Sequence, residues 1–256
     1  MILELNNITK TYKTRLGKVS SQALKGISFT VEEGEYVAIM GESGSGKTTL
    51  LNIISTLDNP TSGTILLEGK PMENIKASDM ARFRRENLGF VFQDFNLLDT
   101  FNVKDNILLP LVLSNIHIKE MEKRVHPILK MLNIEKLSEN YPYEISGGEK
   151  QRVAIARGII TEPKLLLADE PTGALDSRAS KTVLNSFREI NNNGQTILMV
   201  THSIAAASHA DRILFIKDGV IYNQIFRGKR NNDELYNLIS DTLSVMTTGG
   251  SVDETI

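Results

Sequence analysis

The 256-residue chain contains no cysteine. Disulfide bonds and thiolate metal sites are therefore excluded, and a reducing cytosol is compatible with the sequence. The chain also lacks a long hydrophobic run. The longest obvious one, ILLPLVL at 107–113, is far shorter than the ~20 residues that a membrane-spanning helix needs. Work at a membrane would therefore require a partner that holds the protein there.

Basic residues are not in excess. The formal net charge at pH 7 is −2, whereas a general nucleic-acid-binding protein needs a surplus of Lys and Arg, so we expect no nucleic-acid partner. The first residues, MILELNNITK, include an acidic residue and no basic stretch before a long apolar run, and they do not predict a secretory signal. The overall balance of hydrophobic and charged residues is typical of a soluble globular protein with a sizeable core.

Five short apolar runs recur along the chain, each ended by turn or polar residues. They are YVAIM (36–40), LGFVF (88–92), LLLA (165–168), TILMV (196–200) and RILFI (212–216). Because apolar and polar residues do not alternate in them, they predict strands buried on both faces, as in a parallel sheet covered by helices. Helical segments intervene, such as SKTVLNSFREI with its apolar residues on one face. The alternation predicts an α/β domain.

Other segments depart from this pattern. ILELNNITKTY and ISFTVEEGE predict antiparallel strands closed by a Glu-Gly turn, and IKDGVIYNQIF predicts a hairpin turning at Asp218-Gly219. Residues 94–144 lack a strand pattern and predict an inserted helical subdomain. DELYNLISDTLSVM predicts an amphipathic helix and TTGGSVDETI a frayed tail. We therefore expect one domain over 1–228, with a helical subdomain at about 94–160, and a C-terminal helix and tail over 229–256.

The stretch GESGSGKTTL (41–50) matches G-x-x-x-x-G-K-[ST] between a predicted strand and a predicted helix. Glycines let backbone N–H groups point at phosphate oxygens, and the helix N-terminus adds partial positive charge. Lys47 can reach the β- and γ-phosphates, and the Thr48 hydroxyl can bind Mg²⁺. The alternative is a glycine-rich turn that matches by chance. The predicted phosphate-binding residues are Gly41, Glu42, Ser43, Gly44, Ser45, Gly46, Lys47, Thr48 and Thr49.

Two acidic residues close the apolar run in KLLLADE. Asp169 ends a predicted strand at the edge where ligands of open α/β sheets bind, so it is expected to hold Mg²⁺ directly or through water. Glu170 is expected to point elsewhere and to act as general base on the attacking water. The alternative interpretation is a pair of solvated acids in a loop.

The stretch EISGGEKQRVAIARGII is the most distinctive in the chain. Ser146 suits a helix N-cap, and Glu149 three residues later completes a capping box. Gly147 and Gly148 in the first turn destabilise a helix, but they would let a phosphate approach the backbone closely. The alternative is simply a poor helix start.

Together these motifs resemble the nucleotide-binding subunits of ATP-binding cassette (ABC) transporters, over residues 1–228. ISGGE corresponds to the signature, LLLADE to the Walker B strand, GALD to the D-loop and VTHS to the switch histidine, all in family order. The resemblance implies a RecA-like P-loop NTPase core with a parallel sheet, an N-terminal antiparallel β-subdomain and an inserted α-helical subdomain. It also implies binding of ATP with Mg²⁺ and hydrolysis to ADP and phosphate, coupled to transport.

The resemblance assigns further roles to single residues. Gln93 in FVFQD would sense Mg²⁺ and water and couple to the membrane partner, and His202 would contact the γ-phosphate. Tyr12 would stack on adenine, although alone it suggests only a packing residue, and Asp176 would communicate across a dimer. The implied catalytic residues are Glu170, His202 and Gln93, and the implied metal ligands are Thr48, Gln93 and Asp169.

One departure from the family concerns the signature, which reads ISGGE where LSGGQ is usual. We predict that the Glu149 carboxylate points back to the Ser146 N–H and not at a nucleotide. In the family, the signature of one copy closes over ATP held by another, so a homodimer with two ATP molecules is implied. The residues expected to face the partner's ATP are Ser146, Gly147, Gly148 and Glu149.

The resemblance also implies an integral-membrane permease that holds the chain at the cytoplasmic face of the membrane. LLDT followed by VKDNILLPL is most similar to ATPases of bacitracin-type antimicrobial-peptide resistance transporters, which often work with a sensor histidine kinase. Lipoprotein-release or cell-division complexes, and a soluble ABC ATPase, are the alternatives. We expect the permease contact after Gln93. The candidate exposed residues are Phe95, Leu97, Leu98 and Phe101, which could instead pack within the insertion.

Overall fold

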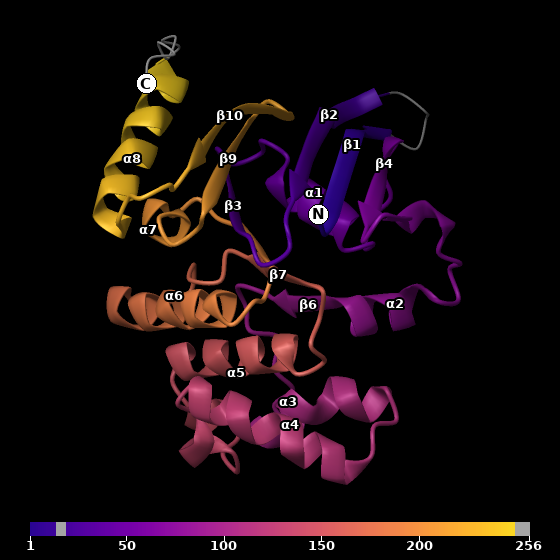
Figure 1. Cartoon of the computed structure of the whole chain (residues 1–256), viewed down its shortest axis with the longest axis vertical. Coiled ribbons are helices and arrows are strands. Elements are labelled where there is room, and N and C mark those ends of the chain that lie inside the picture. The colour runs from indigo at the N-terminus through magenta and orange to yellow at the C-terminus, as the bar shows by residue number, and fades with distance from the viewer. Residues whose placement is uncertain (14–18, 249–256) are drawn as a thin grey trace.

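The computed structural model describes residues 1–13 and 19–248, whose strands form two sheets (Figure 1). The smaller sheet has the order β2-β1-β4-β5, with β1 at Leu3–Lys13, β2 at Val19–Val31, β4 at Ser62–Leu67 and β5 at Lys70–Pro71. The predicted antiparallel pairing of β1 and β2 is confirmed. The Glu33-Gly34 turn, however, follows β2 and leads into the next strand, so it does not close this pair.

The larger sheet carries all five predicted buried strands. Its order is β10 (Val220–Phe226), β9 (Arg212–Lys217), β3 (Tyr36–Met40), β8 (Ile197–Val200), β7 (Leu165–Asp169) and β6 (Leu88–Val91). Strands β9, β3, β8, β7 and β6 run parallel, as expected for short apolar runs without alternation. Only β10 is antiparallel, and the predicted hairpin turns at Asp218 and Gly219, with φ of 50° and 80°.

Helices cover both faces of this sheet. They are α1 (Lys47–Ile54), α2 (Met80–Asn87), α3 (Val103–Leu113), α4 (Ile118–Met131), α5 (Gly147–Ile159), α6 (Ser177–Asn192), α7 (Ile204–Ala207) and α8 (Asn232–Thr248), with 3₁₀ turns η1 (Met72–Asn74), η2 (Glu135–Leu137) and η3 (Pro142–Glu144). Alternate residues of β3 enter two different cores, because successive strand side chains point to opposite faces. Val37 and Ile39 pack toward α1 and the smaller sheet, whereas Tyr36 and Ala38 pack toward α5 and α6.

The inserted segment is helical, as predicted, and Figure 1 shows α3 and α4 beyond α5 at the end of the molecule farthest from the smaller sheet. The loop after Gln93 is closed by the buried side chain of Asn106. Its Oδ1 accepts from the Leu98 N–H at 2.8 Å and its amide donates to the carbonyls of Leu98 and Phe101. Of the four candidate residues, only Leu98 is exposed. Leu97 packs against the core, and Phe95 and Phe101 are half-buried, as the alternative of packing within the insertion implied.

The C-terminal segment forms the predicted amphipathic helix. Leu235, Ile239 and Met246 of α8 belong to the same core cluster as β3 and α6. Thr247 and Thr248 continue the helix, while the rest of the predicted tail, 249–256, lies outside the described residues. In the part of the chain that the structure describes, the helices are too short or too polar to cross a membrane.

Candidate ATP site

The predicted motifs meet at one edge of the larger sheet. Strands β3, β8, β7 and β6 are consecutive parallel neighbours, and Val200 pairs with both Ile39 and Asp169. The carboxyl ends of parallel strands lie at the same edge, where α/β proteins bind ligands. This edge therefore carries the segment that follows each strand: the glycine-rich loop after β3, His202 after β8, Glu170 after β7 and Gln93 after β6.

The loop from Gly41 to Gly46 leaves no space for side chains at its ends. A Cβ atom on Gly41 would lie 2.2 Å from the carbonyl oxygen of Ile216. A Cβ on Gly46 would lie 2.6 Å from the carbonyl oxygen of Ala23, and φ of 106° at Gly46 is unfavourable for other residues. Gly46 is also the N-cap of α1, where no side chain caps the helix. The backbone N–H groups of the first turn are consequently suited to an anion.

Lys47 lies across this loop. Its Nζ donates to the carbonyls of Gly41 and Glu42 at 2.8 and 2.9 Å, and the residue is only 8% exposed. Burial lowers the pKa of Lys47, and the negative charges of Glu170 and Asp169 partly oppose that shift. A buried ammonium beside two carboxylates is placed to exchange carbonyl oxygens for phosphate oxygens, which carry more negative charge.

A cavity of about 420 Å³ opens in front of the loop. It is lined by Ser21, Gln22, Ala23, Lys25, Ser43, Gly44, Gly46, Lys47, Thr48, Thr49, Glu170, His202, Asp218 and Gly219. The structure thus brings the predicted Lys47, Thr48, Glu170 and His202 together. The walls from β2 and from the β9–β10 turn were not predicted. These walls are joined by a hydrogen bond from the Lys25 N–H to the Gly219 carbonyl, a contact between distant segments that leaves no local sequence pattern.

Glu170 and His202 form a pair beside the cavity. Glu170 has the left-handed φ of 46°, and its N–H donates to the Val200 carbonyl. One carboxylate oxygen lies 2.8 Å from Nδ1 of His202, and the other accepts from the Thr201 hydroxyl and from the His202 N–H at 3.1 and 3.2 Å. The Glu170 side chain is mostly buried, whereas that of His202 is 73% exposed. The carboxylate is therefore held in place at the cavity wall, and the imidazole can reach a ligand.

Asp169 has a different environment, as predicted. Its Oδ1 is buried and has no hydrogen-bond partner among the described residues. Burial raises the pKa of Asp169, as does the charge of Glu170, while Lys47 opposes the shift. A buried carboxylate oxygen without a donor is a suitable ligand for a hard cation, so Asp169 fits the expected Mg²⁺.

The other expected metal ligands are a hydroxyl and an amide. Thr48 lines the cavity, and the exposed Gln93 packs its amide against Gly173, where an added Cβ would lie 3.0 Å from the Gln93 Cδ. In the described residues no group of three His, Cys, Asp or Glu could hold a metal by itself. Phosphate oxygens and water would therefore complete the coordination of Mg²⁺.

The signature forms the start of α5, and none of its residues lines the cavity. Ser146 is the N-cap. As predicted, the carboxylate of Glu149 turns back, accepting from the Ser146 N–H at 2.8 Å and from its hydroxyl at 2.6 Å. These hydrogen bonds lower the pKa of Glu149. The signature is thus complete as a helix start, but it does not line the cavity in front of the phosphate loop of its own chain.

Asp176 and Tyr12 also lie outside the cavity lining. Asp176 is the N-cap of α6, where Oδ1 accepts from the backbone N–H groups of Arg178 and Ala179, both at 2.9 Å. Tyr12 pairs across β1 and β2 with Ser21, which does line the cavity. The role of Asp176 across a dimer and the stacking of Tyr12 on adenine remain predictions.

Replacing Glu149 with Gln is expected to change turnover and ATP-driven dimerisation by less than about tenfold, because an amide oxygen can still accept both bonds from Ser146. The measurement is steady-state ATPase activity together with size-exclusion chromatography in ATP. Glu149→Ala is the matched variant, which removes the acceptor of both bonds from Ser146 and should lower stability by about 1 kcal/mol. A change of tenfold or more in Glu149→Gln would mean that the carboxylate acts on the nucleotide.

Comparison with known proteins adds to this geometry. Residues 24–173, more than half of the chain, match the sequence model of a family described as "ABC transporter". The chain belongs to the ABC transporter family. It is 51% identical to the ABC transporter ATP-binding protein YxdL of Bacillus subtilis, over 99% of this chain and 96% of YxdL. It is 46% identical to the bacitracin export ATP-binding protein BceA of Halalkalibacterium halodurans, over 96% of both chains.

Solved structures agree with the fold. The dimeric structure of the ABC transporter cassette MJ0796 of Methanocaldococcus jannaschii has a TM-score of 0.78 and 38% identity, covering 88% of this chain and 98% of that one. A second structure of the same cassette is a post-hydrolysis state bound to ADP and Pi. The α/β cassette fold predicted from the motifs is confirmed. This ABC protein is accordingly an ATP-binding transporter subunit that hydrolyses ATP to ADP and phosphate.

Proposed function

We propose that this subunit powers a permease that exports or senses cell-wall-active peptides of the bacitracin and lantibiotic type. The extent of similarity supports this branch. YxdL and BceA match 99% and 96% of the chain, whereas the macrolide exporter MacB of Chlorobaculum tepidum is 43% identical over 86%. A lipoprotein-release or cell-division complex is therefore the less supported alternative. In the proposed branch, a sensor histidine kinase would be reached through the permease.

The working unit is proposed to be a homodimer that binds two ATP molecules head to tail. The position of the signature supports it, because Ser146 and Glu149 lie outside the cavity of their own chain. MJ0796, a similar cassette, has been seen as a dimer. A signature helix that covers the ATP of a second copy would add a second set of backbone N–H groups to the γ-phosphate. ATP would then favour the closed dimer, and loss of phosphate would release it.

Within each site, the residues have separate tasks. Lys47 and the first turn of α1 bind the phosphates, and Thr48, Asp169 and Gln93 would hold Mg²⁺. The metal would supply neutralisation of charge on the β- and γ-phosphates. Glu170 accepts the proton of the attacking water while its bonds to Thr201 and His202 keep the carboxylate in place. His202, with its ring exposed at the cavity, is placed to contact the γ-phosphate.

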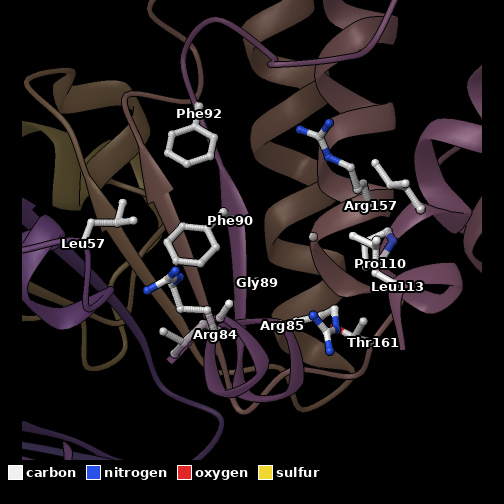
Figure 2. A pocket seen from close by; sticks show the side chains of 14 residues that line it. Leu57, Arg84, Arg85, Gly89, Phe90, Phe92, Pro110, Leu113, Arg157 and Thr161 are labelled. Atoms are coloured by element: carbon white, nitrogen blue, oxygen red, sulfur yellow. The ribbon is translucent and has the colours of Figure 1, made fainter. Parts of the chain in front are cut away.

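The permease is proposed to insert a segment into an apolar groove between β6 and the helical subdomain, a cavity of about 460 Å³. Figure 2 shows Phe90 and Phe92 facing the cavity, with Pro110 and Leu113 across from them. The two phenyl rings are stacked, with centroids 5.7 Å apart. Leu113 is 58% exposed. These side chains form a floor that suits large apolar residues of a partner segment.

Three arginines surround this floor, namely Arg84 and Arg85 of α2 and Arg157 of α5 (Figure 2). Each already donates to its own chain: Arg84 to Thr56, Arg85 to Ser114 and Arg157 to the carbonyls of Phe95 and Asn96. A guanidinium has five N–H donors, so each arginine can also bind an acceptor from a partner. The permease segment is therefore expected to combine large apolar side chains with an acidic residue. The proposed docking groove thus lies near the loop after Gln93, where the permease contact was expected, but most of its lining residues come from other segments.

Leu113→Glu is expected to reduce binding to the co-expressed permease by roughly tenfold or more, because it places a carboxylate in the apolar floor. ATP affinity should stay unchanged, since Leu113 is not among the residues that line the ATP cavity. The measurement is co-purification from membranes. Val112→Glu is the matched control: Val112 is 52% exposed on the same turn of α3 but does not line the groove. Equal loss in both variants, or in neither, would contradict docking in the groove.

The function itself is tested with the chain and its neighbouring permease expressed together. ATPase activity is measured with and without bacitracin or a lantibiotic. A peptide-dependent change in activity is expected. Co-purification without any response to these peptides would argue against this branch, and failure to co-purify would argue against the permease.

A further inference from the structure

Three side chains from two segments meet beside the ATP cavity. Lys10 and Tyr12 lie two residues apart on β1, and Asp58 lies in the turn after α1. One oxygen of the Asp58 carboxylate accepts from Lys10 Nζ at 2.6 Å, and the other accepts from the Tyr12 hydroxyl at 3.0 Å. Lys10 Nζ also donates to the carbonyl of Asn59 at 2.7 Å. The hydroxyl of Tyr12 is thus fixed by an ion pair.

This cluster is shielded from solvent on the lysine side. The Lys10 side chain is 12% exposed, and its Nζ lies 5.0 Å from the centroid of the Tyr12 ring. Tyr12 nevertheless remains 40% exposed, so its exposed part lies on a side that Lys10 does not cover. Burial alone would raise the pKa of Asp58, but the hydrogen bonds from Lys10 and Tyr12 outweigh it and lower that pKa. The carboxylate therefore stays charged at neutral pH and keeps both partners.

The position of the cluster relates it to the nucleotide. Tyr12 pairs with Ser21 across the smaller sheet, and Ser21 and Gln22 line the cavity. Asp58 follows α1, whose first turn contains the phosphate-binding Lys47. The bonds to Asp58 therefore tie β1, the neighbour of the cavity-lining strand β2, to the far end of the helix that begins at the phosphate loop. The cavity reaches from Lys47 to Ser21 and Gln22, so a base attached to phosphates bound at Lys47 has room on this side.

We propose that Asp58 is a positioning residue for ATP: together with Lys10 it holds the Tyr12 ring in the orientation that stacks on adenine. The proposal rests on the stacking role of Tyr12, which the family resemblance implies. An unrestrained tyrosine would lose rotamer freedom when the base binds, and fixing the ring beforehand removes that loss from the binding free energy. The effect is expected to concern the base alone, because neither Tyr12 nor Asp58 is among the residues that line the cavity in front of the phosphate loop.

The test compares ATP with inorganic tripolyphosphate, which has no base, as competitors of a fluorescent nucleotide. Tyr12→Ala should weaken ATP binding by about tenfold or more, the usual value of one stacked base. Asp58→Ala should weaken ATP by about fivefold through the mobility of the ring. Tyr12→Phe, which removes only the hydroxyl and leaves the Lys10–Asp58 pair intact, should act in the same direction. Tripolyphosphate should bind all these variants like the wild type.

The double variant Tyr12→Ala/Asp58→Ala decides between positioning and a structural role. If Asp58 acts through the ring, the double variant should bind ATP no more weakly than Tyr12→Ala. The proposal is overturned if Asp58→Ala weakens tripolyphosphate as much as ATP, or if its effect persists in full without the ring. It is also overturned if Tyr12→Ala binds ATP normally while Lys47→Ala does not. That result would contradict the role of Tyr12 and Asp58, but it would not contradict the ATPase function of the protein.

Discussion

Glu170→Gln is expected to lower ATP hydrolysis by at least about 100-fold while ATP still binds, because it removes the base that accepts the proton of the attacking water. The amide oxygen can still accept from Thr201 and from the His202 N–H, so the local structure should persist. With ATP bound and not consumed, the variant should also accumulate as a dimer in ATP. Phosphate release and size-exclusion chromatography measure the two effects.

Glu189→Gln is the matched control, since Glu189 is an exposed residue of α6 that does not line the ATP cavity. It should hydrolyse ATP at the wild-type rate and show no accumulation of dimer. Normal turnover in Glu170→Gln would remove Glu170 from its proposed role. Loss of ATP binding in that variant would instead show that the carboxylate supports the fold of the site.

Ser146→Arg is expected to reduce ATPase activity about as much as Glu170→Gln, by blocking assembly of the ATP site between two copies and not by removing the base. Ser146 does not line the cavity of its own chain, so ATP binding by a single copy should stay within about twofold of the wild type. A long cation at the start of α5 would obstruct the approach of this helix to the ATP of a second copy and displace the N-cap that accepts from the Glu149 N–H. Binding of a fluorescent nucleotide and phosphate release separate the two steps.

Ser78→Arg is the control for added charge, because Ser78 is exposed in the segment before α2 and lines neither the ATP cavity nor the groove. It should be as active as the wild type. Full activity in Ser146→Arg would contradict a signature that acts on a second copy.

Most of the catalytic edge could be predicted from local sequence. Apolar runs without alternation indicated buried parallel strands, and the carboxyl ends of such strands share one edge. That rule places Glu170 and His202 at the same edge, and the observed pairing of β7 with β8 brings them together. The orientation of Glu149 was also predictable, since a capping box is specified by residues three positions apart.

What could not be predicted depends on contacts between distant segments. The wall of the ATP cavity that carries Gly219 is joined to β2, and a Cβ on Gly219 would lie 2.7 Å from the carbonyl oxygen of Ala23. Asp58 reaches Tyr12 across 46 positions of sequence. The groove is similar, because Leu57, Leu113 and Arg157 come from three separate segments. No local periodicity records such pairs.

Of the two alternatives for Phe95, Leu97 and Phe101, the structure favours packing within the chain, for a related reason. Their apolar character suggested a contact surface, but the buried Asn106 folds this loop back by hydrogen bonds to Leu98 and Phe101. Leu97 then packs against the core. A cavity with apolar lining residues is found instead in the neighbouring groove, which contains none of these three residues.

The most direct test of the account mixes two inactive variants, Lys47→Ala and Ser146→Arg. A mixed dimer contains one site with both an intact Lys47 and an intact Ser146, because each comes from a different copy. Each variant alone should be inactive, and an equal mixture should recover activity, up to about a quarter of the wild-type rate if the two sites act independently. Wild-type activity of Ser146→Arg alone, or no recovery in a mixture that forms dimers, would contradict an ATP site completed by two chains.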